Sequence, residues 1–74
     1  MIIDNDNEKE KALIFSARKT TVHISKLNGI WDNGIILEVG SNFFILKSRL
    51  DGRENIILFD ELKHPIEVFK EVEK

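Results

Sequence analysis

Three stretches of strand-forming residues follow one another in residues 21–48, which read TVHISKLNGIWDNGIILEVGSNFFILKS. Apolar and polar residues alternate at 21–25, which is the period of a strand with one buried face. The Asn-Gly pair at 28–29 is a strong hairpin signal, because a primed turn needs positive φ at both central residues. A second turn at 40–42 separates the last two stretches. The segment therefore predicts three consecutive antiparallel strands.

Gly34 lies inside the second of these strands, which is expected to run from about Ile30 to Val39. A glycine at such a position indicates a bulge, a sharp bend or a close approach of two backbones. A long second strand that bends allows one small sheet to curl onto itself, so we expect a small barrel. A β-branched residue could not replace this glycine without strain, so Gly34→Val is expected to destabilise the fold.

The segments on either side of these strands are expected to form a helix, two further strands and short turns. Residues 8–18 are mostly good helix formers, although the apolar run 12–15 could instead begin a strand. Pro65 cannot donate a ladder hydrogen bond, so the last strand is expected at an edge. The prediction is a flexible leader over residues 1–7 and one domain over 8–74, with a helix at about 8–18 and strands at about 20–27, 30–39, 43–49, 54–59 and 66–70.

The length and composition of the chain limit how it can be stabilised. A domain of 74 residues buries only about 60–65% of its unfolded surface, and no cysteine is present to form a disulfide or a thiolate metal site. Two histidines are too few and too far apart in sequence for a zinc site. Self-association remains as a way to bury more apolar surface, so a homo-oligomer is expected.

The net charge of −2 lies in residues 1–11, where four acids accompany two lysines, and the rest of the chain is neutral. This balance argues against a purely electrostatic nucleic-acid binder but allows a local basic patch. The first residues contain no long apolar run with a basic flank, and no run reaches the roughly 18–20 apolar residues that span a bilayer. We therefore expect a cytoplasmic protein with no membrane partner.

The order of the expected elements resembles that of the Sm-like (LSm) barrels. The first Sm motif is similar to the run Val22-x-Ile24-x-Lys26-x-Asn28-Gly29-x4-Gly34-x-Ile36-x-x-Val39. The resemblance covers about residues 8–70. It implies a mainly β fold, a small five-stranded, strongly bent antiparallel barrel of the Sm-like or SH3-like type with a short N-terminal α-helix. It also implies association with RNA and assembly into rings.

The residues with which Sm proteins hold uridine-rich RNA are not matched in this chain. Gly40 and Phe44 stand where the family places Asp and Asn, and Asp60-Glu61 stands where it has Arg-Gly. Carboxylates at that point would repel phosphate, so no base-contacting residue is carried over from the family. The resemblance therefore implies an RNA-associated barrel that uses a surface other than the family's uridine pocket.

Three cations flank the turn between the third and fourth strands and are the candidate nucleic-acid-binding residues. In a regular hairpin, Lys47 and Arg49 point to the same side, and Arg53 can face them across the turn. Together the three could neutralise phosphates. The alternative is a solvated hairpin tip whose charge is balanced by Asp51 and Glu54.

Aromatic residues offer a second kind of contact. Phe43 and Phe44 point to opposite faces of one strand, so one belongs to the core and the other can stack on a base or line a subunit interface. The pattern does not distinguish between the two. Trp31 is a candidate interface residue, and a lid over the open end of the barrel is its alternative role.

No residue pattern in the chain indicates catalysis. His23 shares a strand face with polar residues and has no fixed carboxylate partner, and His64 precedes a proline in a loop. Asp60 and Glu61 are adjacent carboxylates that fit a helix cap better than acid–base chemistry. The sequence also lacks a phosphate-binding loop, a nucleophile elbow and zinc-ligand spacing. We therefore expect no enzyme activity, no cofactor and no metal site.

The fourth and fifth strands are the expected sites of assembly. The fourth is apolar on both faces and the fifth is short, which would leave open apolar edges in a lone barrel. In Sm-like rings these two strands pair between neighbouring subunits. The resemblance thus implies a ring of about five to eight subunits, with Ile57, Phe59 and Val68 at the junction. The candidate interface residues are Ile57, Phe59, Ile66, Val68 and Trp31.

Two functions are compatible with these observations. The first is an Sm-like oligomeric barrel that associates with RNA through a non-family surface, which the basic turn and the resemblance favour. The alternative is a small barrel that binds another protein or serves as a scaffold without nucleic acid, which the neutral charge favours. The candidate partners are accordingly a second copy of the chain, RNA, and another protein.

Overall fold

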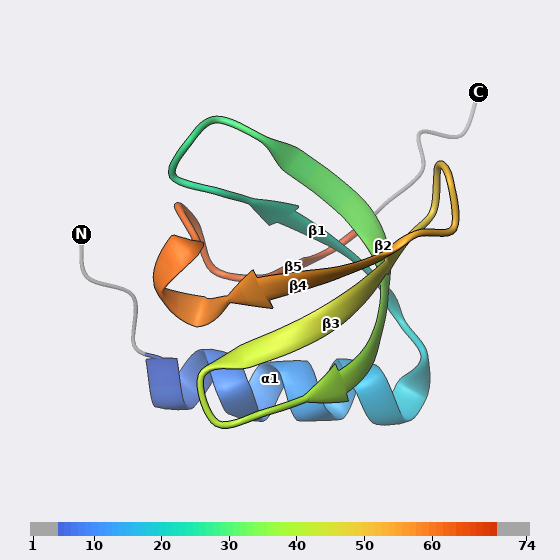
Figure 1. The fold of residues 1–74 in the computed structure, drawn as a ribbon. Coiled ribbons are helices and arrows are strands. Elements are labelled where there is room, and N and C mark those ends of the chain that lie inside the picture. Colours follow the sequence, from blue (N-terminus) through green and yellow to red (C-terminus); the bar gives the residue numbers. More distant parts are fainter. Residues whose placement is uncertain (1–4, 70–74) are drawn as a thin grey trace.

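Five antiparallel strands form one strongly bent sheet in this computed structural model, which describes residues 5–69 (Figure 1). The strands lie in the order β4-β3-β2-β1-β5, so β4 and β5 are the two edges of the sheet. This is the expected mainly β fold with one helix before the strands. The elements are α1 (Asn5–Arg18), β1 (Thr21–Ser25), β2 (Trp31–Val39), β3 (Phe43–Ser48), β4 (Glu54–Leu58), the 3₁₀ turn η1 (Phe59–Glu61) and β5 (Glu67–Val68).

The bounds of the elements differ from those expected, most of all at the helix and at the last two strands. Helix α1 begins at Asn5, so the last part of the leader expected over residues 1–7 is helical, and the rest of that leader lies outside the described residues. Strand β4 ends at Leu58, since Phe59 begins the 3₁₀ turn. Strand β5 is two residues long, and its expected end at residue 70 also lies outside the described residues.

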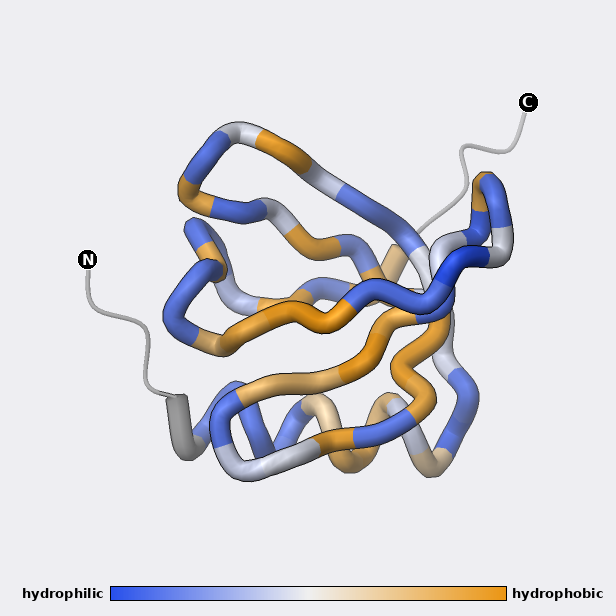
Figure 2. The backbone as a smooth tube through the Cα atoms, in the orientation of Figure 1, coloured by the Kyte–Doolittle hydropathy of each residue, from blue (hydrophilic) through white to orange (hydrophobic). Residues whose placement is uncertain are grey.

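An apolar core lies between the inner face of the sheet and helix α1. Figure 2 shows that apolar residues follow one another along β3 and β4, whereas the hairpin turns are mostly hydrophilic. Of the two adjacent phenylalanines, Phe44 belongs to the core, and its ring centre lies 5.3 Å from that of Phe59. The buried hydrophobic residues are Ala12, Val22, Ile24, Ile36, Phe44, Leu46, Ile57, Phe59, Leu62 and Ile66.

Two features shape the middle of β2. A β-bulge lies between Ile36 and Glu38, where the register against β3 shifts, so the bulge is located beyond Gly34. At Gly34 itself the two strands approach closely. A Cβ added there would overlap the carbonyl oxygen of Lys47 and lie 2.8 Å from its carbonyl carbon. Glycine is therefore required at this position by the closeness of β3, which was one of the expected reasons.

The turn between β1 and β2 is longer than the primed turn expected at Asn28-Gly29. The N–H of Lys26 donates to the carbonyl of Ile30 at 2.8 Å, so three residues form the loop, and of these three Gly29 alone has positive φ, at 86°. The side-chain oxygen of Asn28 accepts the N–H of Ile30 at 3.0 Å. This geometry is that of a type I turn followed by a glycine bulge.

Helix α1 is attached to the sheet by the apolar side chains of Ala12 and Phe15 and by one buried carboxylate. Ala12 is fully buried against the core. Glu8 is 2% exposed, its Oε1 accepts the backbone N–H of Ile66 at 2.7 Å, and its Oε2 pairs with Lys11 at 3.4 Å. A buried carboxylate with both oxygens engaged avoids the cost of an unpaired charge. Glu8 therefore ties the helix to the segment before β5.

The helix ends at a residue with left-handed backbone that is not glycine. Lys19 has a φ of 54°, and its N–H donates to the carbonyl of Ser16 at 3.2 Å. The N–H of Thr20 donates to the carbonyl of Phe15 at 3.0 Å. These two bonds form a Schellman motif, in which glycine is the preferred residue at the position of Lys19.

Lys19→Gly is expected to stabilise the protein by about 1 kcal/mol, because glycine adopts this φ without the strain that a Cβ causes. For a domain of this size, the midpoint of thermal unfolding should then rise by roughly 4–8 °C. Ala17→Gly, in the last turn of the helix, is the control and should lower the midpoint, because glycine is a poorer helix former than alanine. A lower midpoint for Lys19→Gly would show that the backbone at this turn is not strained.

Gly34→Val is expected to destabilise the protein by at least about 3 kcal/mol, because its side chain would overlap the carbonyl of Lys47. Gly29→Val is the control. At that position φ is 86° but no atom lies within 4 Å of an added Cβ, so the cost should be about 1–2 kcal/mol. Denaturant unfolding of both variants measures the difference. Equal losses would mean that the closeness of β3 is not what requires Gly34.

Candidate functional site

A row of outward-facing residues crosses the sheet from β5 to β3. Thr21 lies opposite Ile35, and Ile35 lies opposite Lys47, in the registers of β1, β2 and β3. The N–H of Phe69, directly after β5, donates to the carbonyl of Thr21 at 2.9 Å and extends the row by one residue. Because the neighbouring Val22 is fully buried and successive side chains alternate, the row lies on the outer face.

Arg49 lies next to this row. Its guanidinium carbon is 4.9 Å from the centre of the Phe69 ring, which is a cation–π contact, and its backbone N–H donates to the carbonyl of Asn33 at 2.8 Å. Arg49 and Lys47 line one groove of about 310 Å³. An aromatic ring, an aliphatic side chain and two cations are thus close together. We call this surface the basic ledge, formed by Thr21, Ile35, Lys47, Arg49 and Phe69.

Arg53 lies apart from the basic ledge. Its side chain is 82% exposed, and its Nε lies 3.9 Å from a carboxylate oxygen of Asp51. Arg53 does not line the groove that Lys47 and Arg49 share. Of the three predicted binding residues, the structure therefore brings two together and places the third on the hairpin tip, beside the acid expected to balance it.

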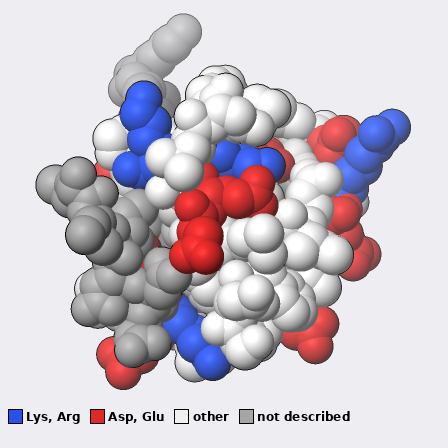
Figure 3. All heavy atoms as spheres, turned by 60° about the vertical axis from the view of Figure 1, so that its left-hand side comes forward, with Lys and Arg blue, Asp and Glu red and all other residues white. Residues whose placement is uncertain are grey.

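The surroundings of the basic ledge carry both signs of charge. Glu54 is the cross-strand partner of Lys47 in β4. On the face that Figure 3 turns forward, acidic and basic side chains lie close to one another among uncharged atoms. A ligand at the ledge would meet a local cationic site and not a broad positive field.

The other predicted aromatic and histidine residues lie on or near the strand surfaces. Phe43 is partly exposed, and its ring fills the space that a Cβ on Gly40 would need. Trp31 is 57% exposed, and its ring centre lies 6.0 Å from that of His23. The Nδ1 of His23 lies 2.5 Å from the side-chain oxygen of Asn33, so this histidine is a hydrogen-bonded strand residue.

The described chain offers no metal centre and no membrane span. Within residues 5–69, no group of three or more His, Cys, Asp or Glu side chains is placed to hold a metal ion. In the same part of the chain, no helix is long and apolar enough to cross a membrane. His64 is exposed in the loop before Pro65.

The five predicted interface residues divide into two groups. Ile57, Phe59 and Ile66 are buried in the core of the subunit, whereas Val68 and Trp31 are exposed. The side chains of the buried three therefore stabilise the subunit itself. Any contact with a partner in their vicinity must use the backbone or the residues between them.

Ile56 and Leu58 are the apolar side chains that β4 exposes, at 65% and 41%. They alternate with the buried Ile57 and lie opposite Ile45 and Phe43 of β3. Sequence reasoning did not single them out, because a continuous apolar run does not indicate which of its residues are buried. They place an apolar surface directly beside one edge of the sheet.

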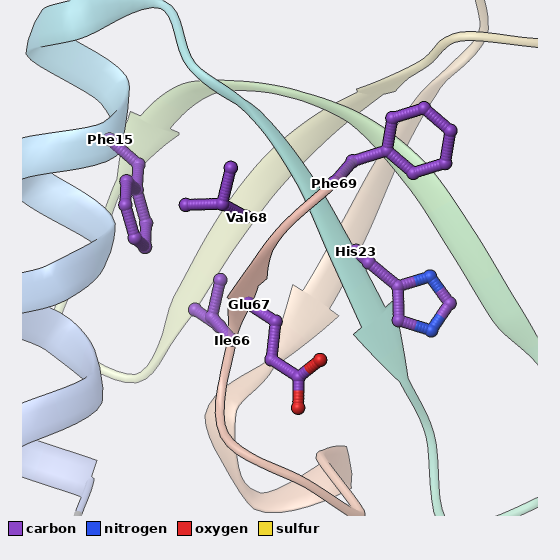
Figure 4. A pocket seen from close by; sticks show the side chains of 6 residues that line it. All are labelled: Phe15, His23, Ile66, Glu67, Val68 and Phe69. Carbon is purple, nitrogen blue, oxygen red and sulfur yellow. The ribbon is translucent and has the colours of Figure 1, made fainter. Parts of the chain in front are cut away.

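An open groove runs along the other edge, at β5. Figure 4 shows Val68 pointing from β5 toward Phe15 of helix α1, with Ile66 beside it. Val68 is 45% exposed, whereas Ile66 is buried. The two edges of the sheet thus share a property, since each has exposed apolar surface next to it.

Each edge also has one backbone N–H that is bonded to a carboxylate. The N–H of Leu58 donates to Oε1 of Glu61 at 3.1 Å, as the N–H of Ile66 does to Glu8. The second oxygen of Glu61 lies 3.3 Å from Nζ of Lys26. The hydrogen bond from Leu58 and, to a smaller extent, Lys26 lower the pKa of Glu61 below its ordinary value. Glu61 is therefore charged at neutral pH.

Comparison with solved structures finds the same fold. The chain is similar to the pleiotropic translational regulator Hfq, whose crystal structure was determined at 1.55 Å. The TM-score is 0.73, the sequences are 24% identical, and the match covers 84% of this chain and 98% of that chain. No protein-family model matches the chain, and no curated protein matches it in sequence. The chain therefore has the Sm-like fold that the sequence resemblance implied.

Proposed function

We propose that this chain forms a cyclic homo-oligomer of Sm-like subunits that associates with single-stranded RNA through the basic ledge. The observation that carries the proposal is the contact of the Arg49 guanidinium with the Phe69 ring, because Arg49 also lines a groove together with Lys47. The protein of similar fold is a translational regulator, and translation is a process that acts on RNA.

The basic ledge offers both kinds of contact that single-stranded RNA uses. Lys47 and Arg49 can neutralise neighbouring phosphates, which holds the backbone whatever its sequence. Phe69 and Ile35 provide an aromatic and an aliphatic surface against which bases can pack. Glu54 lies across from Lys47, and its negative charge offsets part of the positive charge of the ledge. Each subunit therefore holds few phosphates. Strong binding requires several subunits to contact one RNA strand.

Assembly into a ring is supported by the two edges of the sheet. Strand β4 presents Ile56 and Leu58 beside one edge, and β5 adjoins the groove at Phe15 and Val68 on the other. Exposed apolar edges are a liability that natural proteins cover or pair. A contact of β4 in one copy with β5 in the next is head-to-tail, and such contacts close into a ring when the rotation fits.

A second candidate function is a scaffold that binds another protein and no nucleic acid. The acid Glu54 opposite Lys47 favours this alternative, as does the exposed Trp31 on β2, since tryptophan is enriched among the residues that dominate interface energies. The two functions differ in a simple measurement. A scaffold of this kind would bind no RNA at any salt concentration.

Replacing Lys47 and Arg49 by alanine is expected to weaken the binding of a mixed-sequence single-stranded RNA and to flatten its salt dependence. If each residue holds one phosphate, the slope of log K against log salt concentration should fall in magnitude by about 1.4. Adding Arg53→Ala should change the slope little further, because Arg53 lies outside the shared groove. Fluorescence anisotropy at several salt concentrations measures both affinity and slope.

Two further variants define the site. Phe69→Ala should cost about 1–3 kcal/mol of binding free energy without changing the salt slope, because it removes stacking and not charge. Lys63→Ala removes an exposed lysine outside the basic ledge and should leave binding nearly unchanged. RNA binding that is unaffected by the double replacement of Lys47 and Arg49 would place the site elsewhere, and a complete absence of binding would favour the scaffold.

The mass in solution is expected to be a multiple of 8.6 kDa, corresponding to about five to eight subunits. Ile56→Glu should shift the mass toward the monomer, because a charge at the edge of β4 opposes its burial. Leu50→Glu changes a residue that is 80% exposed on the hairpin tip and should leave the mass unchanged. Light scattering coupled to gel filtration decides, and a monomeric wild type at micromolar concentration would contradict the ring.

A further inference from the structure

Each edge of the sheet has one position at which an added strand cannot lie. On β4, the carboxylate of Glu61 accepts the N–H of Leu58 at 3.1 Å. Before β5, the carboxylate of Glu8 accepts the N–H of Ile66 at 2.7 Å. A side chain bonded to an edge N–H occupies the space in which the backbone of a neighbouring strand would run. Leu58 and Ile66 are therefore closed to a partner strand.

Alternate residues of β4 present their backbone groups to the edge. The N–H of Phe59 donates to the carbonyl of Asn42 at 3.0 Å, so the backbone of Phe59 faces β3. In an antiparallel sheet, successive residues direct their N–H and C=O groups to opposite sides of the strand. Leu58, Ile56 and Glu54 therefore face the edge, and with Leu58 closed the latter two can accept a partner.

The same reasoning identifies the residue that β5 offers. The N–H of Phe69 donates to the carbonyl of Thr21 in β1 at 2.9 Å, so the backbone of Phe69 faces inward along the sheet. Val68 and Ile66 therefore face the edge. The N–H of Ile66 is already bonded to the carboxylate of Glu8 in helix α1. Within the described chain, Val68 is therefore the residue through which this edge can pair.

From these positions we infer that Ile56 of one copy pairs with Val68 of the next copy in an antiparallel ladder, and that Glu61 and Glu8 set this register. The inference rests on the proposed ring and specifies which residues meet at its junctions. It makes the two glutamates positioning residues for assembly. Neither of them has to touch the partner strand directly.

The two closed positions select this register from its neighbours. When Ile56 lies opposite Val68, Leu58 lies opposite Ile66, so the closed positions coincide at the end of the ladder. A shift of two residues in one direction would place the closed Ile66 against Ile56, in the middle of β4. The opposite shift would place the closed Leu58 against Val68. Both shifts force a strand into space that a carboxylate already fills.

The side chains fit the same register. Residues that form a hydrogen-bonded antiparallel pair carry their side chains on one face of the sheet. Val68 lies opposite the buried Val22, and it borders the groove beside Phe15 (Figure 4). Pairing therefore brings Ile56, which is 65% exposed in its own subunit, into the groove of the next subunit. The partner that this groove accepts is a second copy of the chain.

Pairs of introduced cysteines test the register, since the chain has no cysteine of its own. Ile56→Cys combined with Val68→Cys is expected to form disulfides between copies on mild oxidation, because paired residues lie about 5.5 Å apart at Cα. Glu54→Cys or Leu58→Cys, each combined with Val68→Cys, displaces one partner by about 6.8 Å and should give no crosslink. Non-reducing gels and mass spectrometry distinguish the three.

The role of the carboxylate is tested in the same system. Glu61→Ala, added to the pair of Leu58→Cys and Val68→Cys, opens the N–H of Leu58 and should allow this crosslink to form. Glu61→Gln keeps a side-chain oxygen that can accept the same hydrogen bond, so it should not. A Leu58 crosslink that is equal in both backgrounds would show that Glu61 does not set the register.

The light-scattering and crosslinking results distinguish a failure of the proposed register from a failure of the proposed ring. A wild-type mass of one subunit in light scattering would overturn the ring and the register with it. An oligomeric wild type in which the Glu54 or Leu58 pair crosslinks as efficiently as the Ile56 pair would overturn the register and leave the ring intact. An oligomer in which none of the three pairs crosslinks would show that β4 and Val68 do not meet.

Discussion

The close contact of β2 with β3 at Gly34 is the constraint on which the rest of the structure depends. There the carbonyl of Lys47 occupies the space that any side chain would need, and the bulge after Ile36 follows within the same strand. The first half of β2 pairs with β1 and the second half with β3, and the two pairings overlap at Gly34 and Ile35. One strand thus bends from one neighbour to the other. This bend allows five strands to enclose a core in a chain of 74 residues.

The same crossing point determines what lies on the outside. Where both pairings overlap, Ile35 has Thr21 on one side and Lys47 on the other, which gives the basic ledge a continuous row of side chains. The hairpin that leaves β3 then directs Arg49 back over Phe69. The cations of the ledge are close together because of strand register, in a chain whose formal net charge is −2.

Much of the fold could be predicted from the sequence, because alternation and turn residues act over a few positions. The strands around the Asn-Gly turn and the glycine at position 34 are signals of this kind. The candidate site could be predicted only in part, since Lys47 and Arg49 are near in sequence but Phe69 reaches them through the register of three strands. Contacts such as that of Glu8 with Ile66 join segments far apart in the chain, and no local pattern indicates them. Residues 56–59 are all apolar and show no alternation of apolar and polar residues, so the sequence does not indicate which of them are buried and which are exposed.

Strand β5 is two residues long, so a contact made through it has little backbone with which to bind. An open row of subunits always has one contact fewer than a closed ring, and the closing contact forms between ends that are already tethered. For those ends the effective concentration is far higher than that of separate chains in solution. In the ring that we propose, weak edges of this kind would favour all-or-none association, with single subunits and complete rings populated and partial rings rare. The amount of complete ring would then respond steeply to how much of the chain is synthesised.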